Sequence, residues 1–316
     1  MNIKRWIGTR EENWQRLDSL LSKIELKRLR SLKSSEIREL ASLYRSITAD
    51  LARARTYNVS RTLVQSLQLL ATRAYTQIYQ GSRKQEWEAV IQFYHWGFPA
   101  VVQQTFPYII TATALFILGM LVGWWYSWQD PRFMSLLVPE SLISQVRDRG
   151  ELWMGSIVGM EPLASSNIMI NNISVSFSAV AGGITGGLFT IYILVFNGLL
   201  IGSIATLVGE NNLAYPFWAF VFPHGALELP AIFFAGAAGL LLGRGILFPG
   251  KYLRVEAIKY YSSLAAQLVF GIVPLLIVAG IIEGFFSPNP IIPDPVKYLA
   301  GLAILILLVM YCKREL

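Results

Sequence analysis

Two ionisable side chains stand four positions apart in FPHGALELPAI, one of the most apolar stretches of the chain. On a helix, His224 and Glu228 would share one face, where an imidazole and a carboxylate can contact each other. Pro223 suits a helix N-terminus, and Pro230 loosens the hydrogen-bond ladder about one turn later. The spacing predicts a helix that starts or kinks inside a membrane and presents an imidazole–carboxylate pair.

Few other polar side chains occur in the apolar part of the chain. A polar group at bilayer depth is costly, and it usually faces the interior of a helix bundle or a water-filled cavity. We therefore expect a candidate intramembrane polar site in which His224 and Glu228 lie together near Asn197. The residues of this site are Asn171, Asn172, Asn197, His224, Glu228 and Glu283.

Three roles compete for the pair: a structural clasp between helices, a proton or cation site for transport, and a metal or acid–base site of an enzyme. Zinc sites normally need three or four protein ligands, and the HExxH motif is absent. The chain has one further histidine, His95, and its lone cysteine, Cys312, leaves no cysteine-based metal site. We therefore expect a non-enzymatic protein without catalytic residues, metal or cofactor.

Charge and apolar residues are distributed unevenly along the chain. Hydrophobic residues make up 54% and charged residues 15%, whereas soluble domains carry about 25% charge. Residues 1–98 hold 17 of the 27 Lys and Arg but only 9 of the 20 Asp and Glu. This asymmetry predicts two domains, a basic cytosolic or juxtamembrane helical bundle over 1–98 and a transmembrane helical domain over 99–316.

The N-terminal region shows the 3.6-residue period of helices that are packed on one side. In one predicted helix the inward positions include Leu17, Leu20, Leu21, Ile24 and Leu29. Acidic residues are interleaved with the basic ones and no recognition motif occurs, so we expect no nucleic-acid partner. The second predicted helix has Asp50 on its polar face, and its inward residues are Ile37, Leu40, Leu43, Tyr44, Ile47, Leu51 and Ala54.

The apolar region is long enough for about six membrane spans of about 20 residues each. Two blocks, Ile173–Val208 and Leu213–Pro249, are too long for one crossing each, and Asn197–Gly198 is a turn-prone break in the first. Basic residues cluster at 244–259 and at the C-terminus. By the positive-inside rule, six spans place this loop and both termini in the cytoplasm, in a protein of the cytoplasmic membrane.

Glycines recur at spacing four in the apolar region. Such pairs let helix backbones approach closely in lipid, where packing replaces the hydrophobic effect between helices. They predict tight helix packing within the chain or between the protomers of a homo-oligomer. The packing glycines are Gly182, Gly183, Gly186, Gly187, Gly198 and Gly202.

Four stretches in this order resemble the stage II sporulation protein M family of polytopic membrane proteins. They are NNISVSFSAVAGGITGG, FNGLLIG, PHGALELPA and AGIIEGFFSP, and the resemblance covers roughly residues 106–288. The basic N-terminal region and the last span are similar to additions in the broader, non-sporulating branch. The resemblance implies an all-helical integral membrane protein without catalytic activity. In spore formers the named member works with peptidoglycan hydrolases at the septal membrane during engulfment, as an anchor or scaffold.

The sequence as a whole predicts an all-α polytopic membrane bundle with two readings of its function. The first is a scaffold or assembly partner for other membrane or envelope proteins, in contact with membrane lipids. The second is a transporter or channel component that uses the intramembrane Asn/His/Glu site. No clear internal repeat, such as transporters often contain, relates 108–208 to 213–312.

Overall fold

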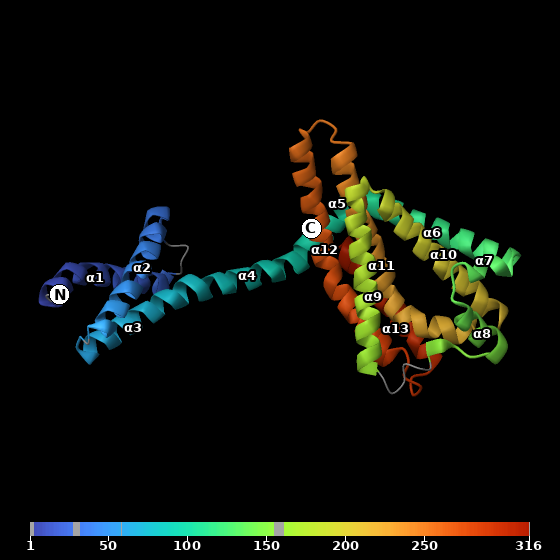
Figure 1. Cartoon of the computed structure of the whole chain (residues 1–316), viewed down its shortest axis with the longest axis horizontal. Helices are drawn as coiled ribbons and strands as arrows, with labels where there is room; N and C mark the ends of the chain where they lie inside the picture. The colour runs from blue at the N-terminus through green and yellow to red at the C-terminus, as the bar shows by residue number, and fades with distance from the viewer. Residues whose placement is uncertain (1–2, 28–31, 58, 155–160, 316) are drawn as a thin grey trace. The chain divides into compact units, whose positions relative to one another are not determined.

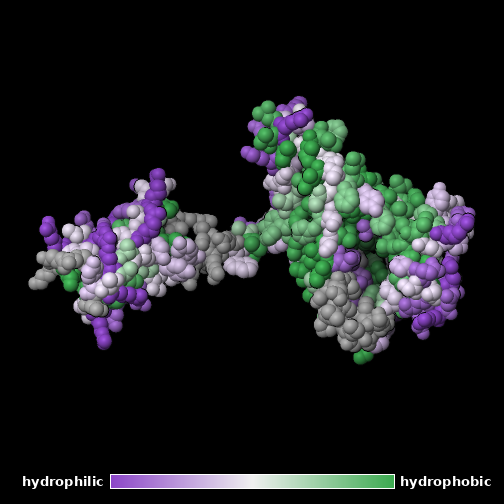
Figure 2. All heavy atoms as spheres, viewed as in Figure 1, coloured by the Kyte–Doolittle hydropathy of each residue, from purple (hydrophilic) through white to green (hydrophobic). Residues whose placement is uncertain are grey.

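The computed structural model describes residues 3–27, 32–57, 59–154 and 161–315 (Figure 1). Its described residues form helices and no strand, which confirms the predicted all-α class. The chain divides into two compact units, Met1–Phe93 and Tyr94–Leu316, near the boundary that the sequence predicts after residue 98. Hydrophilic residues dominate the visible surface of the first unit, and hydrophobic residues dominate much of that of the second (Figure 2).

In the described part of the N-terminal unit, the α-helices become shorter along the chain. Two of them begin with polar groups that satisfy free backbone donors: the Glu36 carboxylate accepts from the Lys33 N–H at 2.7 Å, and the Ser60 hydroxyl accepts from the Leu63 N–H at 3.3 Å. The elements are α1 (Ile3–Lys27), α2 (Ser34–Thr56), α3 (Arg61–Tyr75), the π-helical turn η2 (Thr76–Gln80) and α4 (Gly81–Gln92).

Apolar side chains of α1, α2 and α3 form the core of this unit. Of the predicted inward residues, Ile37 is instead 42% exposed, because it lies in the first turn of α2 at the margin of the core. Leu29 lies outside the described residues. The predicted residues that the core buries are Leu17, Leu20, Leu21, Ile24, Leu40, Ile47 and Ala54.

A buried carboxylate also lies in this core. Asp50, expected on the polar face of α2, is fully buried because α1 supplies its partners. The Trp14 indole N–H donates to Asp50 Oδ2 at 3.0 Å, and the Arg10 guanidinium lies 3.3 Å from Oδ1. A buried charge survives when it is paired and hydrogen-bonded, so this contact fixes how α1 packs on α2.

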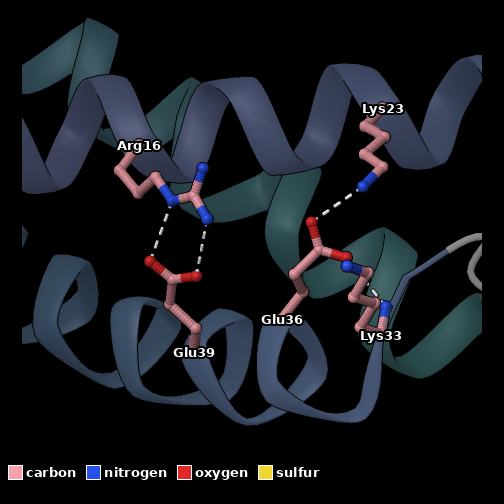
Figure 3. Close-up of polar contacts among 5 residues, drawn as sticks. All are labelled: Arg16, Lys23, Lys33, Glu36 and Glu39. Atoms are coloured by element: carbon pink, nitrogen blue, oxygen red, sulfur yellow. Dashed lines mark hydrogen bonds and ion pairs between the residues drawn. The ribbon is translucent and has the colours of Figure 1, made fainter.

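Ion pairs on the surface join the same two helices (Figure 3). Arg16 makes two hydrogen bonds of 2.8 Å to Glu39, and Lys23 donates to Glu36 at 2.7 Å. The Arg16 hydrogen bond lowers the pKa of the Glu39 carboxyl, and the Lys23 and Lys33 hydrogen bonds lower that of Glu36. The basic residues of this unit are therefore partly neutralised by its own acids.

Among the described residues of the second unit, five helices are long and apolar enough to cross a membrane. They are α6 (Phe106–Gln129), α10 (Leu188–Glu210), α11 (Ala214–Leu247), α12 (Arg254–Ile281) with its π-helical extension η6 (Ile282–Phe286), and α13 (Asp294–Lys313). The other elements are η3 (Phe93–Gly97), α5 (Phe98–Gln104), α7 (Pro131–Ser135), α8 (Glu140–Arg149), α9 (Glu161–Ala181) and the 3₁₀ turn η5 (Gly182–Thr185).

The chain turns at a different place from the one predicted. The expected break at Asn197–Gly198 is wrong, because α10 continues through it. The turn lies instead at Gly186 and Gly187, whose φ angles are +72° and +91°. Glycine adopts this left-handed region without the steric cost that a Cβ would impose. The segment between 173 and 208 is thus divided into α9 and α10 about ten residues earlier than predicted.

Contacts between loops define two ends of the bundle. At the basic end, Gln103 donates to the Cys312 and Arg314 carbonyls, and Gly186 lies against Leu247. At the opposite end, named the α8 end, the core around Val146 and Leu207 joins α8 to α10. The basic end comprises residues 98–105, 182–187, 248–253 and 312–314, and the α8 end comprises residues 130–154, 211–213 and 287–293.

Helix α9 runs from the α8 end to the basic end and packs against α11 and α12 (Figure 1). It is less apolar than the five other long helices, because Asn171 and Asn172 lie in its middle. With α9 included, the chain passes between the two ends six times. The sixth passage therefore comes from a helix that carries two amide side chains on the wall of a cavity.

Close packing of α6 on α10 explains why the predicted break is absent (Figure 1). Gly119 and Gly123 of α6 lie against the backbone of α10 at Val195 and Leu199, and Gly198 and Gly202 of α10 lie against the backbone of α6. A Cβ added to Gly198 would overlap the carbonyl oxygen of Phe116. Gly198 is thus a packing residue inside a helix, as glycines at spacing four are in many membrane bundles.

The remaining predicted glycines surround the turn between α9 and α10. Gly183 lies against the backbone of Gly239 in α11, and a Cβ on Gly182 would come within 2.5 Å of the Thr190 nitrogen. Gly186 meets the Leu247 side chain, whereas Gly187 has only ordinary contacts and depends on glycine for its positive φ.

Candidate functional site

The second unit contains a cavity of about 460 Å³ between α9, α10, α11 and η6. Aromatic residues at the start of α11 and Trp153 line it toward the α8 end, and Leu229 lines it further inside the bundle. The ionisable and amide side chains on its wall are Asn171, Asn172, His224, Glu228 and Glu283.

Helix α11 carries the histidine and one glutamate to this wall. It runs unbroken from Ala214 to Leu247, so of the two predicted alternatives, a helix start or a kink, a start at Pro223 is wrong. Pro223 and Pro230 lie inside the helix, and each lacks the N–H that would bond the carbonyl four residues before it. Because α11 stays helical between the two prolines, His224 and Glu228 lie one turn apart and both line the same cavity.

A π-helical turn brings the second glutamate to the same place. In η6 the Ser287 N–H donates to the Ile282 carbonyl at 2.9 Å, five residues back, in place of the usual four. Such turns are rare and are frequent at functional sites, because they change which face of a helix the following side chains occupy. Glu283 and Ser287 both reach α11 from this turn.

The His224 ring is held between partners on its two nitrogen atoms. Its Nδ1 lies 3.2 Å from Ser287 Oγ, and its Nε2 lies 3.8 Å from Glu283 Oε1. The ring also packs edge-on against Phe220, with 5.5 Å between centroids. His224 is 4% exposed and Ser287 is fully buried. One ligand atom each of His224, Glu228 and Glu283 lies within 4.8 Å of the other two.

Two carboxylates thus stand close together without a cationic side chain. No Lys or Arg is among the described residues that line the cavity. Within the described part of the chain, Glu228 makes no hydrogen bond or ion pair to another residue. An isolated charge in an apolar medium is very costly, so a proton or a cation would stabilise the two carboxylates.

Of the three predicted asparagines, two line the cavity and one does not. Asn171 and Asn172 line the cavity, and the Asn171 side-chain nitrogen Nδ2 lies 3.5 Å from the Asn172 side-chain oxygen Oδ1. Asn197 lies elsewhere and donates to the Ile193 carbonyl of its own helix at 2.8 Å. Sequence reasoning missed Ser287, whose only local signal is its place four residues after Glu283.

Two family models match parts of the chain, one in each unit. A model described as Stage II sporulation protein M matches residues 112–288, which include every polar residue of the cavity. A model described as Domain of unknown function (DUF8413) matches residues 4–80.

Two relatives come from Methanocaldococcus jannaschii. The uncharacterized protein MJ0793 is 28% identical over 190 residues, which are 57% of this chain and 94% of that protein. The uncharacterized protein MJ0706 is 28% identical over 101 residues, which are 31% of this chain and 45% of that protein. No solved structure matches the chain.

Proposed function

The chain belongs to the stage II sporulation protein M family and is a multi-pass membrane protein, and we propose that it is a transporter or channel component. In this proposal a proton or a cationic ligand enters the cavity beside His224, Glu228 and Glu283. The observation that carries it is the pair of carboxylates at one cavity without a Lys or Arg on its described wall. The protein is non-catalytic in this proposal, because binding and release suffice.

A purely structural clasp is the competing role for the same residues. A clasp needs mutual pairing, yet Ser287 and Glu283, rather than Glu228, are the contacts of His224. As a clasp, Glu228→Leu should cost about 1–3 kcal/mol of unfolding free energy by leaving its partner unsatisfied. As a ligand site, Glu228→Leu should leave stability unchanged or increased. Unfolding free energies of wild type and Glu228→Leu separate the two.

A scaffold or assembly role is the second candidate. The family's named member supports it, as does the separate N-terminal unit with a core of its own. Mass spectrometry of partners that co-purify after mild solubilisation tests this role. The same one or two membrane or envelope proteins should be recovered with the full chain and lost without residues 1–93. A full chain that recovers nothing beyond a tag-only control contradicts it.

Charge at the two ends supports an orientation in the cytoplasmic membrane with both termini inside. Residues 244–259 carry four basic residues and one acid, whereas residues 130–154 carry three arginines and four acids. The positive-inside rule then places the basic end in the cytoplasm. In a Cys312→Ala background, an impermeant thiol reagent should label Ser141→Cys in intact cells and leave Lys251→Cys unlabelled. The reverse pattern overturns this orientation.

Water access to the cavity tests the transport proposal. A charged thiol reagent reacts only where water reaches, so it should modify Asn172→Cys, which lies on the cavity wall, in a Cys312→Ala background. Leu302→Cys is the matched control, because Leu302 is 47% exposed in the middle of α13 and would face lipid. If neither cysteine reacts in folded protein, the cavity is closed to water and the transport proposal fails.

A further inference from the structure

We propose that His224, Glu228 and Glu283 bind one divalent first-row transition-metal cation, of which Zn²⁺ is the probe. The inference deepens the proposed function, because it names the ligand class of the same cavity. It starts from three ligand atoms, an imidazole nitrogen and two carboxylate oxygens, that already lie within 4.8 Å of one another. Two carboxylates and one divalent cation would also cancel in charge inside the bundle.

The spacing is close to that of a bound ion. Zinc–ligand distances of about 2.0–2.2 Å in a tetrahedron place ligand atoms about 3.3–3.6 Å apart. His224 Nε2 and Glu283 Oε1 are 3.8 Å apart, so this edge needs only a small contraction. The glutamate side chains can supply it by rotation, without movement of α11 or η6. A fourth position remains for water or for an amide oxygen of the cavity wall.

A second observation, independent of the carboxylates, comes from the other face of the imidazole. Ser287 is fully buried and its hydroxyl lies 3.2 Å from His224 Nδ1. If Nδ1 carries the proton and donates to this hydroxyl, the Nε2 lone pair points to the carboxylates. Histidines that bind metal usually hold their other nitrogen in this way, which fixes the ring and its tautomer.

The types of ligand select the class of ion. Calcium and magnesium are bound by oxygen atoms, whereas an imidazole nitrogen favours zinc and its neighbours in the first row. A monovalent cation would leave one carboxylate uncompensated in the apolar interior. No thiolate lines the described cavity wall, and the thioether of Met154 on that wall is not part of the three-ligand cluster, which disfavours Cu(I).

Zinc titration of the full chain tests the inference. The protein is purified through a tag without histidine, stripped with chelator, and titrated with Zn²⁺ by calorimetry, with bound metal measured by mass spectrometry. We expect one Zn²⁺ per chain. His224→Gln and Glu283→Gln should each weaken binding by more than about 10-fold, and Ser287→Ala, which keeps all three ligands, by about 10-fold.

Matched controls carry the same substitutions outside the cavity. His95→Gln and Glu256→Gln change the other histidine and an exposed acid of α12, and both should bind Zn²⁺ as wild type does. Size-exclusion profiles show whether each variant is folded. If a ligand variant does not fold, the affinity of Ser287→Ala for Zn²⁺ tests the inference in its place. Absence of Zn²⁺ binding by wild type, or unchanged affinity in Ser287→Ala and His224→Gln, overturns the inference.

The two proposals can fail separately. If charged reagents reach Asn172→Cys but no Zn²⁺ binds, the cavity is aqueous and the metal assignment is wrong. If Zn²⁺ binds in a cavity that no reagent reaches, the metal assignment holds and the ion is structural, so transport is excluded.

Discussion

Gly198→Ala adds one methyl group where α6 and α10 cross and should destabilise the bundle. The new Cβ would overlap the Phe116 carbonyl oxygen and lie 2.8 Å from the Met120 nitrogen. Both are backbone atoms, so no side chain can move aside and the helices must separate. Separation also stretches the hydrogen bond of 2.8 Å between the Ser127 and Ser203 hydroxyls.

The size of the effect follows from three contributions. Forcing an extra methyl group into a packed interior costs about 1–3 kcal/mol. Weakening an interhelical hydrogen bond in a membrane protein costs about 0.6 kcal/mol. Alanine is a better helix former than glycine and returns about 0.5–1 kcal/mol. The net loss of unfolding free energy should be about 1–3 kcal/mol.

Gly209→Ala is the matched control, because Gly209 lies in the same helix with no heavy atom within 4 Å of an added Cβ. It should be neutral or stabilise the protein by up to about 1 kcal/mol. Unfolding free energies are measured by SDS titration in mixed micelles. If Gly198→Ala is as stable as Gly209→Ala, the α6–α10 crossing is not packed as described.

Three further predictions concern the turn at the basic end and the N-terminal unit. Gly183→Leu should lower the folded yield, because the leucine side chain would displace the backbone of α11 at Gly239. A variant with the same yield and thermal stability as the wild type would reject this prediction. The Glu36 and Glu39 carboxyls have lowered pKa values, so their ionised forms stabilise the packing of α1 on α2 above pH 4.5, and this contribution is lost as the pH falls below that value. Hydrogen-exchange protection of both helices should therefore decrease below pH 4.5, and the decrease should be smaller in Glu39→Gln. Residues 1–93 should bind anionic vesicles in a salt-dependent way, at about 1 kcal/mol per basic residue near the surface, whereas tight binding to duplex DNA at physiological salt without vesicle binding would reverse the assignment.

Local sequence patterns predicted the class of fold and the polar residues of the membrane region. They could not decide which turn-prone pair becomes a turn. Asn197–Gly198 and Gly186–Gly187 both fit a turn by composition, but α6 uses Gly198 for packing. Asn197 is satisfied by the Ile193 carbonyl within its own helix, so it needs no partner in the cavity. Tertiary packing therefore decided the position of the turn, and a local hydrogen bond decided where the Asn197 amide lies.

Contacts between segments that are distant in sequence could not be predicted either, because they depend on how the helices pack. Ser287 and Glu283 meet His224 from another helix, and only the π-helical turn η6 directs them there. At Pro274, inside α12, the carbonyl of Phe270 loses its helical donor. The Tyr94 hydroxyl, far away in sequence, donates to this carbonyl at 2.9 Å. Residue types identified the groups that need partners, and the fold supplied the partners.

Divalent-cation uptake by proteoliposomes tests the role of the cavity most directly. Wild-type protein should carry Zn²⁺ into vesicles that contain a zinc-sensitive dye faster than it enters protein-free vesicles. Glu228→Gln should abolish this uptake because it removes a ligand charge, and Glu256→Gln should retain it. Uptake by wild type no faster than by protein-free vesicles, or equal uptake by Glu228→Gln and wild type, would contradict a cation pathway through His224, Glu228 and Glu283.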